Sequence, residues 1–208
     1  MSGSHPSRRG FVAGGLGAFG YAALAGPAAA NTPTPSAMEG PFYPTPPMRR
    51  ADVDNDLVRI IGMVEEAGGA VFRLKGRVMD RQGAALAGHR VEIWQCDMNG
   101  KYMHPGDRQA VTFDAAFQGF GHDVTDAEGR YEFRTIKPVA YPGRTPHIHV
   151  KVLDGTREVL TTQFYIAGHP ANRSDFLFNQ MPQAAADAVS MVFTMTDTGE
   201  EAIVDIVI

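Results

Sequence analysis

The sequence predicts an all-β protein, an antiparallel β-sandwich with few short helices. From residue 71 onward, short segments alternate apolar and polar side chains, which is the period of a half-buried strand. Turns rich in glycine and aspartate separate these segments. No internal repeat is present, and residues 171–190 are the only stretch that favours short helices. About seven or eight strands must therefore enclose the core, which is typical of a sandwich.

The expected strands follow in chain order. In VFRLKGRV, Phe72, Leu74 and Val78 alternate with basic residues, so one face of this strand is buried. Residues 105–122 lack any period and are expected to form a long loop of functional importance. The other expected strands are HRVEIWQC, YEFRTI, HIHVKV, VLTTQFYI, VFTMTD and AIVDIVI, and Asp154-Gly155 predicts a tight hairpin after HIHVKV.

Residues 1–30 are expected to be a twin-arginine-type signal peptide. Arg8 and Arg9 precede an apolar run that glycines interrupt, and Ala28-Ala29-Ala30 offers a small-residue cleavage site. The alternatives are an ordinary Sec signal or a retained anchor. No later segment has the ~20 apolar residues that span a bilayer. We therefore expect an exported protein, periplasmic or extracellular, with no membrane contact after signal cleavage.

Two further regions follow the signal. Residues 31–70 are expected to form a Pro-rich N-terminal strap, and residues 71–208 the catalytic β-sandwich. Within the strap, EGPFYP reads as a segment packed on the domain or as a lid over a pocket, with Tyr43 as a candidate substrate-pocket wall. The net charge of −4, without basic clusters, argues against a nucleic-acid partner. The single Cys96 excludes a disulfide within the chain and a thiolate zinc cluster, and a buried inert thiol is expected.

The chemistry centres on the stretch from Tyr141 to Val152, YPGRTPHIHVKV. Alternate residues of a strand share a face, so His147 and His149 project together while the intervening aliphatic residues face the core. Two imidazoles side by side on a strand make half of a metal site. HExxH is absent, and no acidic residue follows the pair as H-x-D/E would require.

Tyrosines are the residues that recur near strand ends, at Tyr102 and at Tyr141. A free phenol ionises near pH 10, but a trivalent cation favours the phenolate, which is a hard oxygen ligand. Two phenolates and one hydroxide neutralise Fe(III), and two neutral imidazoles add no charge. This charge balance favours one Fe(III) per chain over Fe(II) or Zn(II). The alternative for each tyrosine is a buried, hydrogen-bonded phenol.

Four motifs resemble those of the intradiol ring-cleavage dioxygenases, and most closely the iron-bearing subunit of protocatechuate 3,4-dioxygenase. They are EIWQCDMNGKYMH, DAEGRYEFRTIKP, YPGRTPHIHVKV and TTQFYIAG. The upstream segment EGPFYP resembles the family less closely. The resemblance covers roughly residues 72–170. It implies Fe(III) held by Tyr102, Tyr141, His147 and His149, with a catechol-type aromatic and O2 as substrates and a muconate-type diacid as product.

The same resemblance implies roles for individual residues. Tyr102 and His147 would stay bound to iron, whereas the axial Tyr141 would leave when the catechol binds and would take a substrate proton. Arg144 would stabilise negative charge on the attacked ring carbon, and its alternative is a surface salt bridge. Gln163 would lie near the iron or merely fill a strand. Trp94 would wall the substrate pocket or belong to the core.

Several alternatives stay open at this point. The activity could be that of a catechol or hydroxyquinol 1,2-dioxygenase, although residues 31–70 leave no room for the helical dimerisation domain of catechol enzymes. Only GRTP separates Tyr141-Pro142 from the histidine pair, where protocatechuate enzymes carry a longer insert, so the substrate is open. A non-catalytic transthyretin-like ligand-binding sandwich explains the fold but not the four ligands, and a cupin would need a nearby glutamate. The oligomeric state, including a homo-oligomer, is also left open.

Overall fold

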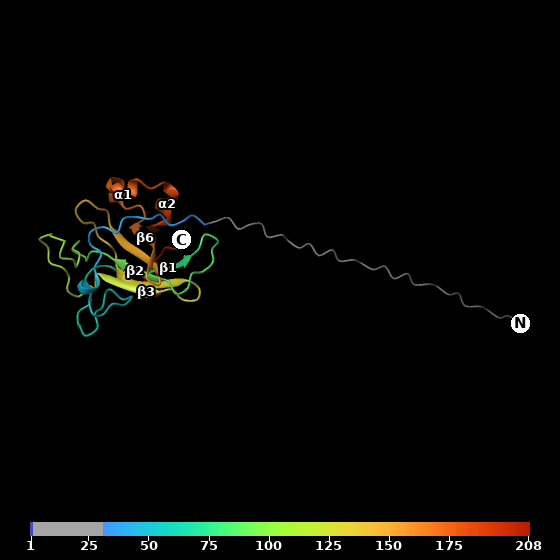
Figure 1. The fold of residues 1–208 in the computed structure, drawn as a ribbon, viewed down its shortest axis with the longest axis horizontal. Coiled ribbons are helices and arrows are strands. Elements are labelled where there is room, and N and C mark those ends of the chain that lie inside the picture. The colour runs from blue at the N-terminus through green and yellow to red at the C-terminus, as the bar shows by residue number, and fades with distance from the viewer. Residues whose placement is uncertain (2–30) are drawn as a thin grey trace.

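The computed structural model describes Met1 and residues 31–208, and Figure 1 shows their arrangement. Apart from Met1, the export signal predicted at residues 1–30 lies outside the described residues. The described chain consists mainly of short strands, with two short α-helices and two 3-10 turns. The predicted all-β sandwich with few short helices is thereby confirmed.

Ten strands form within the described residues, and they make two five-stranded sheets. In the first sheet β4 pairs with one edge of β1, while β9 and β10 pair with the other edge and β8 follows β9. The second sheet has the order β3-β2-β5-β6-β7. The strands are β1 Val71–Met79, β2 Arg90–Trp94, β3 Phe120–Val124, β4 Arg130–Ile136, β5 His147–Asp154, β6 Arg157–Ile166, β7 Ser190–Met191, β8 Phe193–Thr196, β9 Gly199–Ile203 and β10 Ile206–Val207.

The pairing is mixed rather than purely antiparallel, which corrects one detail of the prediction. β1 pairs with β9 and with β10 in parallel, and β6 pairs with β7 in parallel. The hairpin-connected strands β5 and β6 pair antiparallel, as do β8 and β9. Parallel partners need a long connection. The chain between β6 and β7, and that between β1 and β9 or β10, is such a connection, so tertiary packing decides that these strands pair.

The core lies between the two sheets and follows from strand alternation. Phe72 and Leu74 of β1 have at most 1% of their surface exposed, and they face Ile93, Ile148 and Val150 of the second sheet. Each such side chain contributes about 1.5–3 kcal/mol on burial. The predicted alternation in VFRLKGRV and HIHVKV is therefore confirmed. It also leaves the opposite face of β5 free for polar groups.

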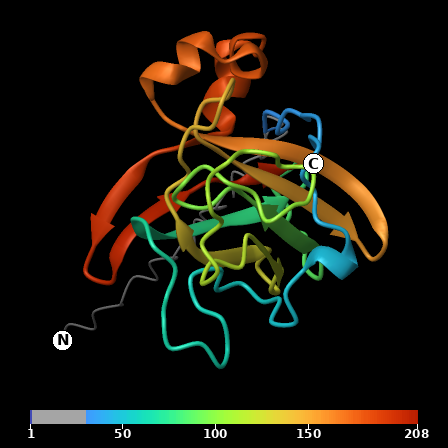
Figure 2. The same cartoon turned by 90° about the vertical axis from the view of Figure 1, so that its left-hand side faces the viewer.

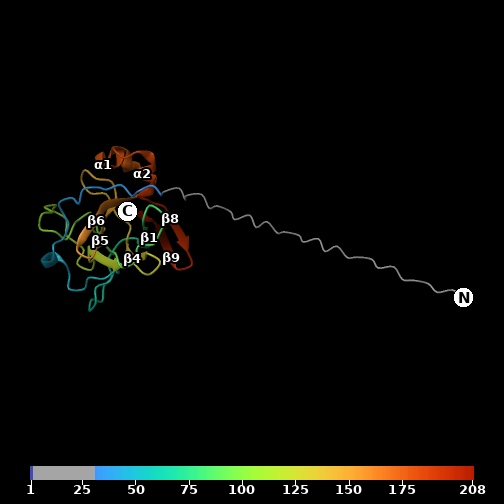
Figure 3. The same ribbon diagram turned by 45° about the vertical axis from the view of Figure 1, so that its right-hand side comes forward.

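The short helical elements lie between β6 and β7, as predicted for residues 171–190. They are η2 Pro170–Ser174, α1 Phe176–Asn179 and α2 Gln183–Ala188. Asp175 caps α1 by accepting hydrogen bonds from the backbone N–H groups of Leu177 and Phe178. Figure 3 and Figure 2 show these helices together at one end of the sandwich. None of the described helices has the length and apolar character needed to cross a bilayer.

The middle of the N-terminal strap, residues 31–70, lies over the outer face of the second sheet, whereas its end bonds to β4 of the first sheet, where Leu57 N–H meets Arg134 O. Its backbone bonds to the sandwich where Thr34 N–H meets Val207 O and Ala37 N–H meets Thr161 O. One 3-10 turn, η1 Pro46–Met48, interrupts it, although the prolines led us to expect no helical turn there. Proline is tolerated at the first positions of a helical turn, which explains the difference.

One predicted boundary was wrong. Residues 105–122 were expected to form a loop, but β3 begins at Phe120. Phe120 pairs with Trp94, and His122 pairs with Glu92, across β2. This strand is short and contains Gly121, so its apolar alternation is too weak to be recognised in the sequence. Pairing with β2 is what makes it a strand.

Candidate metal centre

The candidate site lies on the outer face of the second sheet, under the strap. Strand alternation in β5 points His147 and His149 to this face. The sheet register places Trp94 of β2 and Gln163 of β6 on either side of His149. Three neighbouring strands therefore present an indole, two imidazoles and an amide side by side. Local sequence fixes the β5 pair, and the strand register brings in the other two groups.

The two imidazoles converge. Their Nε2 atoms are 3.1 Å apart, and His147 and His149 are only 1% and 2% exposed. Thr145 O lies 2.7 Å from His147 Nδ1 and accepts its proton, so the lone pair of His147 Nε2 points toward His149. Burial, reinforced by the positive charge of Arg144, lowers the pKa of His147 to about 4. Burial and the neighbouring His147 lower the pKa of His149 well below its usual value. Both rings are thus neutral at pH 7, the form that binds a metal.

Trp94 holds the second imidazole in place. Its indole stacks on His149 with ring centroids 4.8 Å apart and an angle of 10° between the planes. His149 Nδ1 is buried and has no hydrogen-bond partner in the described part of the chain. Stacking on Trp94 therefore orients the His149 ring, as the hydrogen bond to Thr145 O orients the His147 ring. Trp94 has no exposed surface, so it lies behind the ring instead of facing solvent.

Both predicted tyrosines lie against the imidazoles. The rings of Tyr102 and Tyr141 meet edge to face with centroids 5.5 Å apart. Tyr141 lies 5.5 Å from His147, and Tyr102 lies 6.1 Å from His149, again between ring centroids. The structure thus brings all four predicted ligands to one place. Tyr102 is 3% exposed, whereas Tyr141 is half-buried, so the two phenols differ in their access to solvent.

The turn after β2 positions Tyr102. Asp97 Oδ1 accepts hydrogen bonds from Asn99 N–H and Lys101 N–H, which closes the turn. Gly100 has a φ of 75°, a conformation that favours glycine. Asp107 then accepts the backbone N–H of Tyr102 through Oδ2 at 2.8 Å. The G-x-Y spacing in the sequence reflects this tight turn.

The donor set fits a cation. The described residues hold no group of three or more His, Cys, Asp or Glu side chains that could bind a metal, and the rings against the imidazoles are the phenols of Tyr102 and Tyr141. The buried hydroxyl of Tyr102 has no hydrogen-bond partner among the described residues. A buried polar atom without a partner costs about 1–3 kcal/mol. Two imidazole Nε2 atoms within hydrogen-bond distance of each other, with a buried phenol beside them, are a donor set that a hard cation with some affinity for imidazole would bind.

Arg144 lies beside this group and is held on two sides. Its Nε bonds to Asp175 Oδ2 at 2.8 Å, and its Nη2 donates to Gln163 Oε1 at 2.6 Å. Its Nη1 is 3.4 Å from His147 Nε2. Arg144 is therefore not a surface ion pair. Its guanidinium is fixed and aimed at the metal-binding edge of the histidine.

The partners of Arg144 form a network that the sequence did not reveal. Gln163 Oε1 also accepts the hydroxyl proton of Tyr165 at 3.0 Å, and Gln163 Nε2 donates to Met38 O of the strap. Asp175 lies 31 positions from Arg144 and is 1% exposed. Sequence reasoning missed Asp175 and Tyr165, because no spacing pattern links them to the histidine strand. The one available signal for Asp175 is its position as a helix N-cap.

Phe42, rather than Tyr43, contacts the predicted ligands. The Phe42 ring stacks on Tyr102 with centroids 4.7 Å apart and approaches Tyr141 edge-on at 6.5 Å. Tyr43 turns the other way, onto Trp94, and its hydroxyl donates to Glu92 Oε2 at 2.7 Å. The EGPFYP motif therefore does reach the site, but through the aromatic residue that we did not select.

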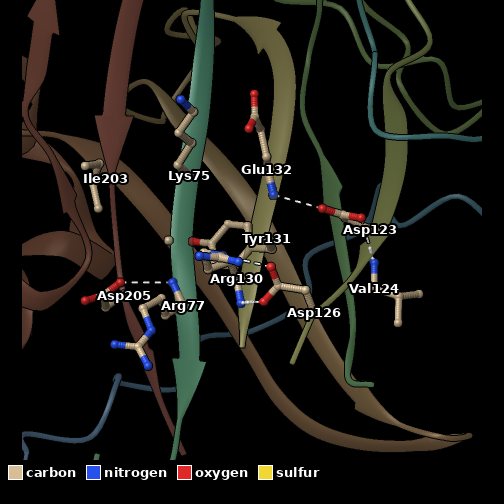
Figure 4. Close-up of a pocket in the computed structure, with 11 residues that line it drawn as sticks. Lys75, Arg77, Asp123, Val124, Asp126, Arg130, Tyr131, Glu132, Ile203 and Asp205 are labelled. Carbon is tan, nitrogen blue, oxygen red and sulfur yellow. Dashed lines mark hydrogen bonds and ion pairs between the residues drawn. The ribbon is translucent and has the colours of Figure 1, made fainter. Parts of the chain in front are cut away.

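Two cavities need to be distinguished. A cavity of about 390 Å³ opens beside Tyr141 and is lined by Phe42, Asp107, Arg108, Gln109, Tyr141 and Pro142. A larger one, about 650 Å³, lies along β1 and β4 of the first sheet, and Figure 4 shows it. There Asp205 accepts Arg77 N–H and Asp126 accepts from Arg130, so neighbouring chain groups already bind these charges. No predicted site residue lines the larger cavity.

Comparisons with known proteins agree with this geometry. The family model described as Dioxygenase matches residues 38–207. The protocatechuate 3,4-dioxygenase beta chain of Burkholderia cepacia is 38% identical over 159 residues, which are 72% of this chain and 66% of that relative. Catechol 1,2-dioxygenase 1 of Acinetobacter lwoffii is 32% identical over 164 residues, 70% of this chain and 50% of that relative.

Solved structures give the same fold. The dioxygenase domain of a dioxygenase carbohydrate-binding protein fusion from Streptomyces sp. SirexAA-E is 33% identical, with a TM-score of 0.62 over 85% of this chain and 98% of that one. The intradiol ring-cleavage dioxygenase of Tetranychus urticae has a TM-score of 0.65 at 20% identity, covering 85% and 94% of the two chains, and supports the fold alone.

These matches define the class of protein, an all-β dioxygenase. The chain belongs to the intradiol ring-cleavage dioxygenase family. It spans between half and two thirds of the length of the two curated relatives named above. Those relatives differ in substrate, one acting on protocatechuate and the other on catechol by their names.

Proposed function

We propose that this protein is a non-haem Fe(III) intradiol dioxygenase that inserts O2 between the two hydroxyl-bearing carbons of a catechol-type aromatic, giving a muconate-type diacid. The observation that carries the proposal is the approach of the His147 and His149 Nε2 atoms to 3.1 Å, with two phenol rings against them. Intradiol dioxygenases use non-haem iron. Fe(III) bound by these four residues would supply a Lewis acid that chelates the catechol and makes it reactive toward O2.

The two tyrosines have different tasks. Tyr102 is buried under Phe42 and held by the turn after β2, so it is the phenol that stays in place. Tyr141 is half-buried and lines the 390 Å³ cavity. It is the phenol that gives way to the substrate, and its Oη accepts a proton from a substrate hydroxyl. This difference in burial supports the roles implied by the family resemblance.

Arg144 acts on the charge of the reacting ring. Its guanidinium is fixed by Asp175 and Gln163 and reaches within 3.4 Å of His147 Nε2. A cation that is already oriented stabilises negative charge as it develops, without a cost for reorganisation. Gln163 is a positioning residue in this scheme, because it holds both Arg144 and the strap.

The experiment is purification of the chain with iron, followed by visible spectroscopy and oxygen uptake. Ferric–tyrosinate charge transfer gives a burgundy protein with a broad visible band, and catechol or protocatechuate gives a ring-opened diacid with one O2 consumed. Catechol and hydroxyquinol 1,2-dioxygenase activities are separated by the substrate that gives the highest kcat/KM. A protein that holds iron but stays colourless and inactive would contradict the proposal and favour a non-catalytic transthyretin-like binding module.

Export by the twin-arginine route to the periplasm or outside the cell is part of the same proposal. Arg8, Arg9 and the glycine-interrupted apolar run support it. This route carries folded proteins, which suits a chain that binds its metal before export. Fractionation of cells that express the full chain tests it. Replacing both arginines by lysine should retain the protein in the cytoplasm.

A further inference from the structure

The cavity beside Tyr141 is the one that a substrate would enter where Tyr141 gives way to it, as proposed above. Of the four predicted ligands, Tyr141 is the one that lines it, and the other three are at most 3% exposed. At about 390 Å³ the cavity lies in the range of small-molecule sites and suits a single substituted ring. Whatever lines its mouth therefore contacts the substituents of the ring and not the reacting diol.

The cavity has an apolar side and a polar side. Phe42, Tyr141 and Pro142 offer flat, apolar surfaces for an aromatic ring. Asp107, Arg108 and Gln109 form the polar side. An aromatic ring that slides in along the apolar side brings its outer substituents against these three residues.

The charges on the polar side do not cancel. Asp107 is already engaged, because Oδ2 accepts Tyr102 N–H and Oδ1 accepts both Gln109 N–H and Lys101 Nζ. The ammonium of Lys101 neutralises that carboxylate at 3.3 Å. The Arg108 side chain is exposed, and within residues 31–208 its guanidinium makes no hydrogen bond or ion pair that meets ordinary distance criteria. One positive charge at the mouth of the cavity is left for a ligand.

We propose that Arg108 determines substrate specificity, and that the substrates of this protein are catechols carrying a carboxylate on the ring or on a short side chain. The inference rests on the proposed dioxygenase function and adds the substrate class. A guanidinium pairs with a carboxylate through two parallel hydrogen bonds, which selects an acid over a neutral or basic substituent. The other arginine near the site, Arg144, is already held by Asp175 and Gln163, so Arg108 is the guanidinium at the cavity that is left for a substituent of the ring.

The test is anaerobic titration of the iron-loaded protein with 3,4-dihydroxybenzoate and with catechol, followed by the shift of the visible band. The wild type should bind 3,4-dihydroxybenzoate more tightly than catechol. R108Q should raise the Kd for 3,4-dihydroxybenzoate about five- to tenfold more than the Kd for catechol. R108E should change this ratio further in the same direction. R108K keeps the charge but not the two parallel hydrogen bonds, so it should restore only part of the preference. Raising the salt concentration should shrink the wild-type preference, because the pair is near solvent.

The matched control is R157Q, which removes the same charge from the exposed turn between β5 and β6, where Arg157 pairs with Asp154. It should leave the ratio of the two Kd values unchanged. A wild type that cleaves catechol but shows no preference for the acid, or an R108Q ratio equal to that of the wild type, overturns the assignment of Arg108 alone. A wild type that neither binds nor cleaves either ring overturns the proposed function as well.

Discussion

The two faces of the second sheet are buried to the same extent but differ completely in chemistry. The inner face presents Val91, Ile93, Ile148, Val150 and Val152, all at 0% exposure. The outer face presents Glu92, Trp94, His147, His149 and Lys151, none more than 5% exposed. The first sheet covers the inner face, and the N-terminal strap covers much of the outer one. Depth of burial therefore says little about where the site lies.

What separates the functional part of the outer face is whether its polar groups have partners. Glu92 binds Tyr43, Arg49 and Arg90, and Lys151 is paired with Glu39 and Glu158. On the same face of β5, and in the turn after β2, His149 Nδ1 and the Tyr102 hydroxyl make no hydrogen bond of ordinary geometry within the described chain. Buried polar groups without partners are rare and costly. Within the described residues, those on Trp94, Tyr102 and His149 lie together at the predicted metal centre, and the others are on Arg50, Gln118 and His122.

The largest expected effect on activity comes from substitutions of the predicted ligands on the outer face of the second sheet. Replacing His147 by alanine, or Tyr141 by phenylalanine, removes one predicted ligand but no core packing. Ring cleavage should fall below detection and the visible band should weaken or shift, while the far-ultraviolet circular dichroism stays that of the wild type. Oxygen uptake and absorption spectra measure the effect. Turnover that persists in both variants would show that these residues do not hold the metal.

The inner face should respond in the opposite way. Ile148 lies between the two histidines in the sequence, but its side chain faces the core. Its replacement by alanine therefore creates a cavity in the core. The free energy of unfolding should fall by about 2–5 kcal/mol, with the visible band retained in the fraction that is folded. Urea unfolding followed by tryptophan fluorescence measures the loss. A variant that loses its colour and keeps its stability would break the distinction between the faces.

A substitution of Glu92 probes the part of the outer face where the polar groups have partners. Its carboxylate is 3% exposed and binds a tyrosine and two arginines that hold the strap and the sheet together. E92Q keeps the shape but weakens these charge-assisted bonds, so unfolding should become easier by about 1–3 kcal/mol. The strap should also become more accessible to protease. R130Q, which removes an exposed ion pair of the first sheet, is the control and should change stability little.

The smallest effect concerns pH. Burial raises the pKa of the Asp175 carboxyl, but hydrogen bonds from the Phe178 and Thr145 backbones and from Arg144 outweigh it, so the folded pKa lies below the ordinary value. A lowered folded pKa stabilises the protein above the unfolded value of about 3.9, and this stability is lost as the pH falls through the folded pKa. The difference in unfolding free energy between wild type and D175N should therefore shrink below about pH 4. If the difference in unfolding free energy between wild type and D175N grows as the pH falls, the pKa of Asp175 is not lowered in the folded protein.

Much of the site could be predicted because its residues follow local rules. The two-residue period of HIHVKV put His147 and His149 on one face, and the turn chemistry around Gly100 placed Tyr102 at a strand end. The structure gathers these residues with Tyr141 and Arg144. The fold class was also accessible, since alternation and turn signals repeat along the chain. Each of these features depends on residues within a few positions of one another.

Other features are decided only by contacts between distant parts of the chain. The parallel pairing of β9 and β10 with β1, the recognition of β3, and the choice of Phe42 over Tyr43 as the residue against the ligands all belong to this group. Asp175 reaches Arg144 across 31 positions. The sequence alone determined the strand periods and the placing of His147 and His149 on one face, because backbone geometry imposes both locally. The tertiary structure decided which polar groups find partners and which do not, because that depends on how separate segments pack.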